Sequence, residues 1–406
     1  MFAMKNITIG FIGTGHMGGA IAKRLSNVNI LLHNRSANKA QTLAKAIGDN
    51  AQVCDPLSLC AKSRFVFLGV KPADMQGLSH TLSTASGEAI FVSMAAGLSL
   101  SSLEALFPGH KLIRIMPNTP VEVGKGITFV SFGNITEEEK AEFFSLMAPC
   151  GQCVEIEESK IDAASVLTGS APAYLDYFLD ALAEAGTKLG LSKEEATAYS
   201  LAMAEGAVAL AKQSDHTPKE LGAAVCSPGG STIEGVDVLL SHGLYDDLAL
   251  AAASTYYKNR ALGGKYPFYG ANNALVTPID PRFENVLNPY RLYDLLLNLW
   301  CRSTCAPRMQ DQWSEDNKTL GQCSITAFLV QDIFGGEVYG VPLGDGNFHC
   351  FNYVNGKLFD LTSEQFLPTV LTYTLEYPQS RETHFAKEEK RLRYEALKES
   401  LLNVLS

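Results

Sequence analysis

Three features are scarce in this chain of 406 residues: long apolar runs, positive charge in excess and patterned cysteines. The longest apolar stretches, such as residues 89–98, reach about half the length that a bilayer-spanning helix needs. The 33 Lys and Arg are outnumbered by 43 Asp and Glu, and the net charge of −10 disfavours a nucleic-acid-binding surface. We therefore expect neither a membrane nor a nucleic acid as a partner.

The nine cysteines follow no spacing typical of a disulfide framework, which favours a reducing compartment, and no leader segment precedes the first strand. We therefore expect a cytoplasmic protein. Cys150 and Cys153 form a C-x-x-C pair where a helix gives way to a strand, not at the start of a helix as in redox enzymes. Cys301 and Cys305 have no matching His or Cys pair, so we expect no metal site.

The stretch that carries the clearest pattern lies near the amino terminus. An apolar segment at 7–12 runs into Gly13-Thr14-Gly15-His16-Met17-Gly18, an apolar-periodic helix follows, and a second strand is expected over 28–33. In this strand–turn–helix context, the glycines allow a pyrophosphate to approach the backbone at the amino end of the helix. The pattern predicts a dinucleotide-binding unit.

Alternating elements continue to about residue 155 and then give way to helices. Apolar strands are expected at 65–70, 89–94 and 112–116, and helices at 36–47 and from 136. We predict an α/β, Rossmann-type doubly wound domain over 1–157 and an all-α dimerisation domain over 158–270. The helix at 170–189 is apolar almost all round, which is typical of a helix buried against a partner subunit. The Asn- and Pro-rich segment 271–288 is expected to be a linker, and 289–406 a small α+β domain.

The residues after the second strand indicate which nicotinamide cofactor is used. NAD-binding sites carry an acidic residue about 20 positions after the first glycine, whereas this chain has Asn34 and Arg35 there. Arg35, together with Lys39, is suited to a 2′-phosphate, or is simply a surface charge at a helix start. The pattern favours NADPH and leaves NADH open.

Six motifs occur in the order found in pyrroline-5-carboxylate reductases, and residues 4 to about 268 resemble that family. The motifs are Gly10–Ile21, Gly69–Pro72, Ser93–Gly97, Arg114–Pro120, Thr168–Tyr174 and Ser227–Thr232. The resemblance implies reduction of 1-pyrroline-5-carboxylate to L-proline and a homodimer with interwoven helices, assembled further into a ring. It also implies cofactor contacts at Gly13, Thr14, Gly15, His16, Met17, Gly18, Asn34, Arg35, Val70, Lys71, Pro72, Ala95, Ala96, Gly97 and Asn118.

The substrate is expected at the turn before residue 231. The free N–H groups of this turn, at the start of a helix, suit a carboxylate, and we assign substrate contacts to Ser227, Gly229, Gly230, Ser231 and Thr232. Thr232 matches the family hydroxyl that bonds the imine nitrogen, which implies a catalytic role in orientation and proton relay, with helix capping as the alternative.

A β-hydroxyacid dehydrogenase is the alternative function from a related class. Those enzymes share the glycine-rich turn and the Asn-Arg pair, but they carry a catalytic lysine on the interdomain helix. Here that helix begins Ser170-Ala171-Pro172-Ala173-Tyr174, without a lysine.

The last hundred residues contain a second candidate site. Cys323 opens an apolar stretch expected to be helical, and Asn355-Gly356 predicts a tight hairpin that makes His349 and Asp360 diagonal neighbours on one face. Cysteine at a helix start, then histidine, then aspartate is the chain order of papain-like and transglutaminase-like enzymes and suits thiolate attack. The alternative is a buried cysteine and a satisfied strand histidine in a non-catalytic module that binds a ligand or packs on the reductase.

The segment from about residue 289 also resembles the small bacterial YunG-like family, through Gly321-Gln322-Cys323, Phe334-Gly335-Gly336 and Asp360-Leu361-Thr362. That resemblance implies no activity. Residues 362–365 match a capping box, and a last helix over 382–405 carries Tyr394, Leu397 and Leu401 on one face, which indicates docking on a protein surface.

Overall fold

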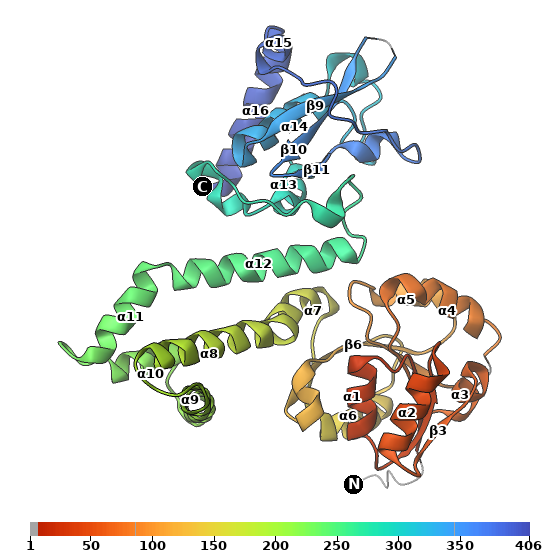
Figure 1. Cartoon of the computed structure of the whole chain (residues 1–406). Helices are drawn as coiled ribbons and strands as arrows, with labels where there is room; N and C mark the ends of the chain where they lie inside the picture. The colour runs from red at the N-terminus through yellow and green to blue at the C-terminus, as the bar shows by residue number, and fades with distance from the viewer. Residues whose placement is uncertain (1–6, 86, 345) are drawn as a thin grey trace. The chain divides into compact units, whose positions relative to one another are not determined.

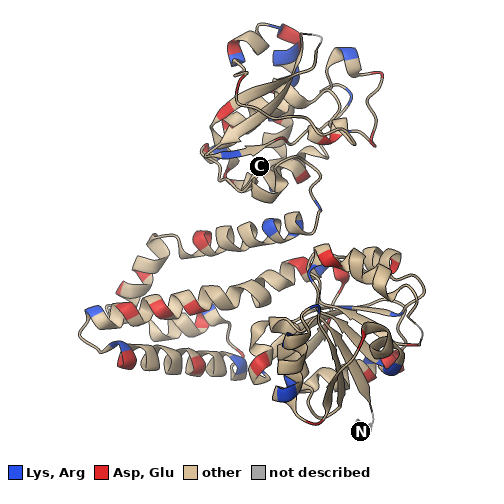
Figure 2. Ribbon diagram, turned by 45° about the vertical axis from the view of Figure 1, so that its right-hand side comes forward, with Lys and Arg blue, Asp and Glu red and all other residues tan. Residues whose placement is uncertain are grey.

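The computed structural model describes residues 7–85, 87–344 and 346–406, so residues 1–6 of the expected first domain lie outside it. The chain forms two compact units, residues 1–252 and 253–406, and the boundary falls within helix α12 (Leu244–Leu262). In the described part, no helix combines the length and apolar character that crossing a bilayer would require. Acidic and basic residues are interspersed along the helices of both units (Figure 2).

The first unit is built on a sheet of eight strands within the described residues, in the order β3-β2-β1-β4-β5-β6-β7-β8. Strands β1 to β6 are mutually parallel, β7 is antiparallel to β6, and β8 is parallel to β7. The strands are β1 (Thr8–Ile12), β2 (Asn29–His33), β3 (Ala51–Val53), β4 (Phe65–Leu68), β5 (Ile90–Ser93), β6 (Leu112–Met116), β7 (Gly126–Phe132) and β8 (Gly151–Glu155).

Helices cover both faces of this sheet, because successive residues of the buried strands point to opposite sides. Phe65 and Phe67 pack with α1, α2 and α6, whereas Val66 and Leu68 pack with α3, α4 and α5 (Figure 1). The helices are α1 (His16–Arg24), α2 (Ala37–Ile47), α3 (Pro56–Lys62), α4 (Met75–Leu82), α5 (Leu100–Leu106) and α6 (Glu137–Met147). The doubly wound prediction is confirmed, and the predicted capping box at Thr136 starts α6.

A run of helices completes the first unit. A π-helical turn, Val166–Ser170, joins α7 to α8, and Ser192 and Thr217 begin α9 and α10 with capping boxes. Helices α8 and α9 lie side by side (Figure 1). The helices are α7 (Glu158–Ser165), α8 (Ala171–Lys188), α9 (Lys193–Gln213), α10 (Pro218–Val225) and α11 (Ser231–Ser241).

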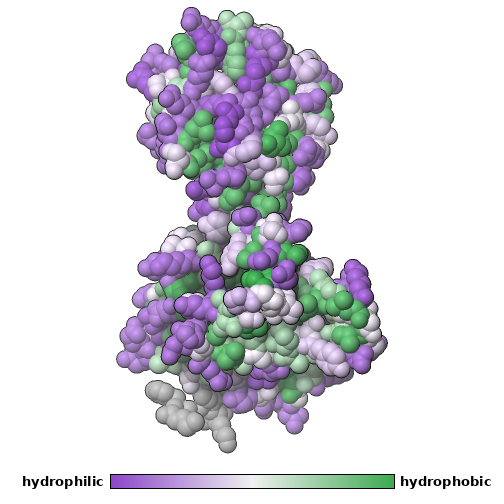
Figure 3. Space-filling view, turned by 90° about the vertical axis from the view of Figure 1, so that its left-hand side faces the viewer, coloured by the Kyte–Doolittle hydropathy of each residue, from purple (hydrophilic) through white to green (hydrophobic). Residues whose placement is uncertain are grey.

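The apolar surface of α8 is not buried within one chain. Tyr177 is 79% exposed, and Leu175 and Phe178 are 49% and 47% exposed, although the sequence predicts a buried helix. The neighbouring helices also expose large apolar side chains, and Figure 3, which faces the α9–α11 end of this unit, shows them among polar ones. Within the described part of the first unit, these side chains of α8 stay exposed.

The second unit packs helices on a small antiparallel sheet. In the described residues the sheet has the order β11-β10-β9, with β9 (Glu337–Pro342), β10 (Phe348–Val354) and β11 (Lys357–Phe359). The predicted two-residue turn forms, with Asn355 at φ 49° and Gly356 at φ 76° between the paired residues Val354 and Lys357. The helices are α13 (Pro289–Leu296), α14 (Cys323–Phe334), α15 (Arg381–Phe385) and α16 (Glu388–Leu405).

Three details of this unit correct the sequence predictions. The expected linker, 271–288, is packed into the core, because its apolar residues Ala274, Phe283 and Val286 are fully buried between the polar ones. The expected last helix is interrupted between α15 and α16, although Tyr394 and Leu401 of α16 dock on the core of this unit as predicted. The capping box at Thr362 does not form.

Candidate functional sites

The glycine-rich turn after β1 has the shape that a dinucleotide site needs. Gly13 has φ 97°, and a Cβ on it would lie 2.5 Å from the carbonyl oxygen of Gly69. A Cβ on Gly18 would lie 2.6 Å from the carbonyl oxygen of Gly13, whereas one on Gly15 would meet no described atom within 4 Å. The first and third glycines therefore keep the turn compact, and the second leaves its backbone open to a ligand.

The start of α1 offers hydrogen-bond donors that the chain does not use. Gly15 is the N-cap residue, no side chain caps the helix, and its first turn has no acidic residue. The Thr14 N–H donates to Asn34 Oδ1 at 3.2 Å, which fixes the turn against the end of β2. Thr14 Oγ1 is buried and has no hydrogen-bond partner among the residues described. These features fit a pyrophosphate at the end of the helix.

The predicted 2′-phosphate residues lie beside this turn. Arg35 follows β2 with a side chain that is 94% exposed, and its guanidinium is 3.9 Å from the carboxylate of Asp74. Lys39 lines a cavity of about 560 Å³ together with Thr14, Gly15 and His16. The two cations are therefore free to reorient toward a phosphate next to the glycine-rich turn.

The remaining predicted cofactor residues follow neighbouring parallel strands. Residues 70–72 come after β4 and residues 95–97 after β5, so they share the sheet edge at which β1 ends. Met17, the second residue of α1, packs against the core of the first unit. Asn118, after β6, is buried and engaged within the chain: its Oδ1 accepts from Ile127 N at 2.8 Å and its Nδ2 donates to Thr168 O at 3.0 Å.

Sequence reasoning missed a buried arginine at this sheet edge. Arg114 on β6 is 4% exposed and pairs with Glu158 at 3.1 Å and with Asp162 at 2.8 Å, both on α7. These ion pairs attach the first helix of the helical region to the sheet. Arg114 lies in a motif that the sequence analysis used only for its resemblance, and no local pattern marked its partners.

The predicted substrate turn lies before α11. Gly230 N donates to Ser227 O at 2.9 Å, Gly229 has φ 71°, and a Cβ on Gly230 would lie 2.5 Å from Ser227 Oγ. No side chain caps α11, so the first N–H groups of the helix, beside Ser231 and Thr232, are available to an anion. In Figures 1 and 2, α11 lies at the opposite end of the helical region from the glycine-rich turn. One chain therefore does not bring the two sets of predicted residues together.

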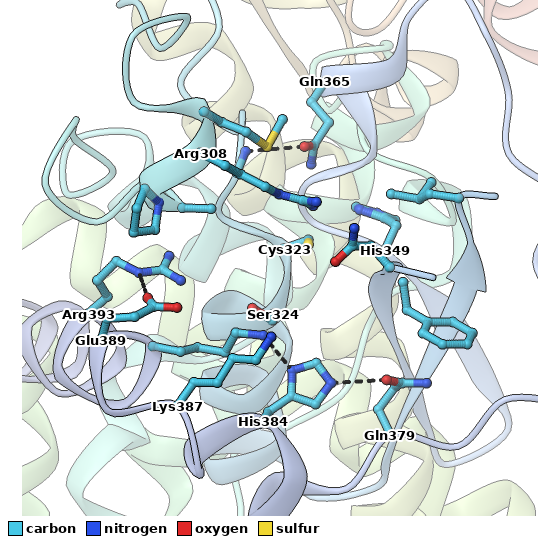
Figure 4. A pocket seen from close by; sticks show the side chains of 18 of the residues that line it. Arg308, Cys323, Ser324, His349, Gln365, Gln379, His384, Lys387, Glu389 and Arg393 are labelled. Atoms are coloured by element: carbon cyan, nitrogen blue, oxygen red, sulfur yellow. Dashed lines mark hydrogen bonds and ion pairs between the residues drawn. The ribbon is translucent and has the colours of Figure 1, made fainter. Parts of the chain in front are cut away.

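In the second unit, by contrast, the three predicted residues meet. His349 on β10 and Asp360 after β11 are each 1% exposed, and His349 Nε2 lies 2.5 Å from Asp360 Oδ2. The other ring nitrogen, Nδ1, is buried and has no hydrogen-bond partner in the described part of the chain. Cys323, the first residue of α14, is partly exposed and lines the same cavity as His349 (Figure 4).

Asp360 is held by several donors. Its Oδ1 accepts from both the N–H and the hydroxyl of Thr362 at 2.9 Å, and its Oδ2 accepts from the Tyr373 hydroxyl at 2.8 Å. The Thr362 hydroxyl is therefore engaged with Asp360, which is why the expected capping box does not form. Although burial raises the pKa of Asp360, the charge of His349 and these hydrogen bonds lower it below its usual value.

The cysteine and the histidine favour an ion pair. A hydrogen bond from the Cys350 thiol and the positive charge of His349 outweigh burial and hold the pKa of Cys323 well below its usual value. Burial lowers the pKa of His349, but Asp360 and then Cys323 raise it to about 10. Both shifts favour a thiolate beside an imidazolium, the reactive form of a nucleophilic cysteine.

Packing fixes this arrangement. Helix α14 packs on β10, and Asn352 Nδ2 of β10 donates to Ala327 O of α14 at 2.8 Å. Gly321 has φ 69°, and a Cβ on it would lie 2.7 Å from Cys305 Sγ. Because Gly321 lacks that atom, the segment after Cys305 lies directly against the start of α14.

A cavity of about 640 Å³ opens over Cys323 and His349. Four positively charged residues line it: Arg308, Lys387, Lys390 and Arg393. Among the described lining residues, the single carboxylate is that of Glu389 (Figure 4). Among the residues that the structure describes, no cluster of His, Cys, Asp and Glu suits a metal ion. Burial raises the pKa of both thiols of the C-x-x-C pair, Cys150 and Cys153, to about 12, which disfavours their thiolate forms.

Comparison with known protein families divides the chain in three. Residues 8–97 match the family model described as NADP oxidoreductase coenzyme F420-dependent. Residues 158–262 match pyrroline-5-carboxylate reductase dimerisation, and residues 288–406 match the YunG protein family.

Relatives and solved structures agree with this division. A pyrroline-5-carboxylate reductase of Corynebacterium melassecola is 35% identical over 271 residues, which are 63% of this chain and 98% of that protein. The enzyme of Aquifex aeolicus is 37% identical over 241 residues, 58% of this chain and 89% of the relative. The structure of 1-pyrroline-5-carboxylate reductase from Streptococcus pyogenes superposes with a TM-score of 0.59 at 29% identity, covering 63% of this chain and 99% of the other. The reductase of Plasmodium falciparum, solved with NADP bound, superposes with a TM-score of 0.57 at 27% identity, covering 64% of this chain and 100% of the other.

Proposed function

This chain belongs to the pyrroline-5-carboxylate reductase family, and from that premise we propose that it reduces 1-pyrroline-5-carboxylate to L-proline with NADPH. The observation that carries the proposal is the glycine-rich turn, in which Gly15 is open and the Thr14 hydroxyl has no hydrogen-bond partner among the described residues. The same chain carries a turn before α11 in which no described side chain caps the helix. The nine cysteines are all free, which supports the cytoplasmic setting that we propose for the enzyme.

NADPH, when bound, supplies the hydride, and the residues around β1 hold it. We assign the pyrophosphate to the N–H groups of Gly15, His16 and Met17 and to the Thr14 hydroxyl. Arg35 and Lys39 supply the positive charge for the 2′-phosphate. The residues after β4 and β5 form the remaining wall of the site at the same sheet edge.

The turn before α11 is assigned to the substrate. A carboxylate accepts hydrogen bonds from the first N–H groups of α11, which favour negative charge. Thr232, in the first turn of this helix, then holds the imine nitrogen with its hydroxyl and relays a proton to it. No metal or covalent step is needed, because orientation of the C=N bond toward the hydride is the main requirement.

We propose that two chains complete each reductase site. The glycine-rich turn and the α11 turn lie apart in one chain, and the exposed apolar side chains of α8 are the surface that a partner chain would cover. The dimerisation family match over 158–262 supports a homodimer, and we propose that such dimers assemble further into a ring.

The test is an NADPH-oxidation assay with 1-pyrroline-5-carboxylate and three variants of one residue. We expect Thr232→Ala to lower kcat by about 100-fold, Thr232→Ser to retain most of the activity and Thr232→Val to behave as the alanine variant. Full activity of Thr232→Ala would contradict the assigned role. A lack of turnover with this imine, together with turnover of a β-hydroxyacid, would contradict the proposed function itself.

A further inference from the structure

We propose that the second unit is itself an enzyme, in which Cys323, His349 and Asp360 transfer the acyl group of an anionic amide or ester to water through a thioester. The inference rests on the juxtaposition of these three side chains: Cys323 and His349 line a cavity whose charged lining residues are mostly cationic, and Asp360 is buried against His349. It is independent of the reductase function, because all of these residues lie within residues 253–406.

The positions fit the parts of a nucleophilic site. Cys323 is at the amino end of α14, where the helix dipole favours a thiolate, and His349 Nδ1 is the ring nitrogen left for it because Nε2 bonds Asp360. Asp360 is fixed in turn by Thr362 and Tyr373, so the imidazole orientation is set by a carboxylate that cannot rotate freely.

The reaction balances without a cofactor. The Cys323 thiolate attacks the acyl carbon, a C–S bond forms, and the carbonyl electron pair moves onto oxygen. Collapse of this intermediate breaks the bond to the amine or alkoxide, which leaves with the proton of His349. Water then attacks the thioester, gives its proton to His349 and releases the carboxylic acid and the thiolate.

Backbone amides at the start of α14 are placed to bind the oxyanion. The first N–H groups of a helix have no intrahelical acceptor, and the N–H of Cys323 belongs to this set. The side chain of Gln365 also lines the cavity, where its Oε1 accepts from Gly321 N at 3.3 Å and its Nε2 donates to Thr362 O at 2.7 Å. The wall beside the nucleophile is therefore polar and ordered.

The charge of the cavity indicates the substrate class. Arg308 and Lys387 stand on opposite walls, and Arg393 is oriented by Glu389 at 3.1 Å (Figure 4). Lys390 donates to Nδ1 of His384 at 3.1 Å, while Nε2 of His384 donates to Gln379 at 3.0 Å. Burial lowers the pKa of His384 to about 4, so this histidine is a neutral acceptor rather than a second base. The lining favours a substrate that carries a carboxylate or another anion.

The proposal distinguishes this unit from a packing module. A structural cysteine and histidine need neither an unpartnered ring nitrogen at 1% exposure nor a cavity of about 640 Å³ above them. Buried polar atoms without partners are uncommon in folded proteins, and a catalytic role is one of the reasons for which they occur.

The experiment uses the full chain and two chromogenic esters, neutral 4-nitrophenyl acetate and the anionic 4-nitrophenyl monoester of succinic acid. We expect a burst of about one equivalent of nitrophenolate per chain, an acyl mass increment on the peptide that contains Cys323, and acylation about tenfold faster with the anionic ester. Lys387→Ser is expected to reduce this preference without abolishing the burst.

Cys301→Ser provides the matched control. Cys301 is also a partly exposed cysteine, and hydrogen bonds from Ser303 and Thr304 lower its pKa against the effect of burial, but it does not line the cavity. The burst should be lost in Cys323→Ser and retained in Cys301→Ser, with both variants checked by circular dichroism. A burst that survives Cys323→Ser, or a wild-type Cys323 inert to both esters and to iodoacetamide, would overturn the activity. A faster reaction with the neutral ester would overturn the substrate class.

Discussion

The glycine-rich turn before α1 and the cysteine at the start of α14 both use the amino end of a helix, but their companion residues are distributed differently. The residues that would complete the reductase site, at 227–232, lie in the turn before α11 and at the start of that helix, away from the glycine-rich turn. His349 and Asp360 are instead buried beside Cys323, within one unit. We propose that a second copy of the chain completes the divided site, whereas the site built on adjacent elements is complete within one unit.

Surface chemistry follows the same difference. The helical region exposes large apolar side chains such as Tyr177 at 79% and Leu189 at 88%, which a monomer rarely leaves uncovered. The second unit has one continuous core formed by α13, α14, α16 and the sheet, although Ile279, Leu367 and Val370 are exposed at its surface. The comparison therefore predicts that changes in oligomeric state affect reduction and leave the thiol untouched.

The largest effect is expected from a charge on α8. Phe178→Glu places a carboxylate on the surface that we assign to the partner chain, so we expect monomers and a loss of reductase activity of at least about 100-fold. Cys323 should react with iodoacetamide at the wild-type rate. Light scattering measures the oligomeric state, and an NADPH-oxidation assay measures the reductase activity. Phe178→Leu is the control, which should stay dimeric and active.

Removal of the carboxylate beside His349 should act on the thiol site. In Asp360→Asn the imidazole loses the charge that raises its pKa to about 10, and the thiolate loses its cationic partner. We expect iodoacetamide labelling of Cys323 at pH 6.5 to fall about 30-fold, as for an ordinary thiol.

The pH profile separates the two states of this site. In the wild type, labelling should change little from pH 8 to pH 6, because a low pKa keeps Cys323 ionised until the pH falls to that value. In Asp360→Asn the rate should drop about tenfold per pH unit over this range. If the labelling rate depends on pH in the same way in both proteins, and their circular dichroism spectra match, then the His349–Asp360 pair does not control the pKa of Cys323.

The glycines of the first site should separate stability from cofactor binding. Gly13→Ala places a Cβ against Gly69 O at a positive φ, so we expect the free energy of unfolding to fall by about 2–4 kcal/mol. Gly15→Ala meets no described neighbour, so stability should change by less than about 0.5 kcal/mol, while the KM for NADPH rises about tenfold. Denaturant titration measures the free energy of unfolding, and steady-state kinetics measures the KM for NADPH. Equal losses of stability in the two variants would count against the roles assigned to Gly13 and Gly15.

The smallest effect is expected at the cofactor 2′-phosphate. Arg35 is 94% exposed, so its interaction with the phosphate is screened by solvent, and we expect Arg35→Ser to lower the NADPH-to-NADH ratio of kcat/KM by about fivefold. Arg35→Lys should keep part of the preference. If the ratio is unchanged, other residues distinguish NADPH from NADH. If the ratio increases, the assignment of Arg35 to the 2′-phosphate is wrong.

Local pattern was sufficient for the parts of both sites that are close in sequence. The glycine spacing predicted the turn and the helix that follows it, and Asn355-Gly356 set the hairpin register that brings His349 to Asp360. Those signals act over a few residues, through backbone conformations that few side chains allow. Such local patterns are enough to predict the doubly wound fold and the candidate triad without knowledge of long-range contacts.

Long-range contacts account for the rest. Tyr373, which donates to Asp360, and Arg308 and Lys387, which line the cavity, come from separate loops and helices with no shared period. The antiparallel β7 and the packing of 271–288 likewise depend on what the rest of the chain presents to them. The amide of Asn118 bonds two backbone groups that are distant in sequence, and its contact with the cofactor stays a prediction.

Complementation between two inactive chains tests most directly whether the reductase site is divided between copies. Gly15→Val, which blocks the open glycine, and Thr232→Ala, which removes the substrate hydroxyl, are co-expressed with different tags and the mixed dimer is isolated. If each site takes its glycine-rich turn from one chain and its α11 turn from the other, the mixed dimer has one intact site of two and should recover about half of the wild-type activity. If the mixed dimer is as inactive as both parents, each site is built within one chain and the account is wrong.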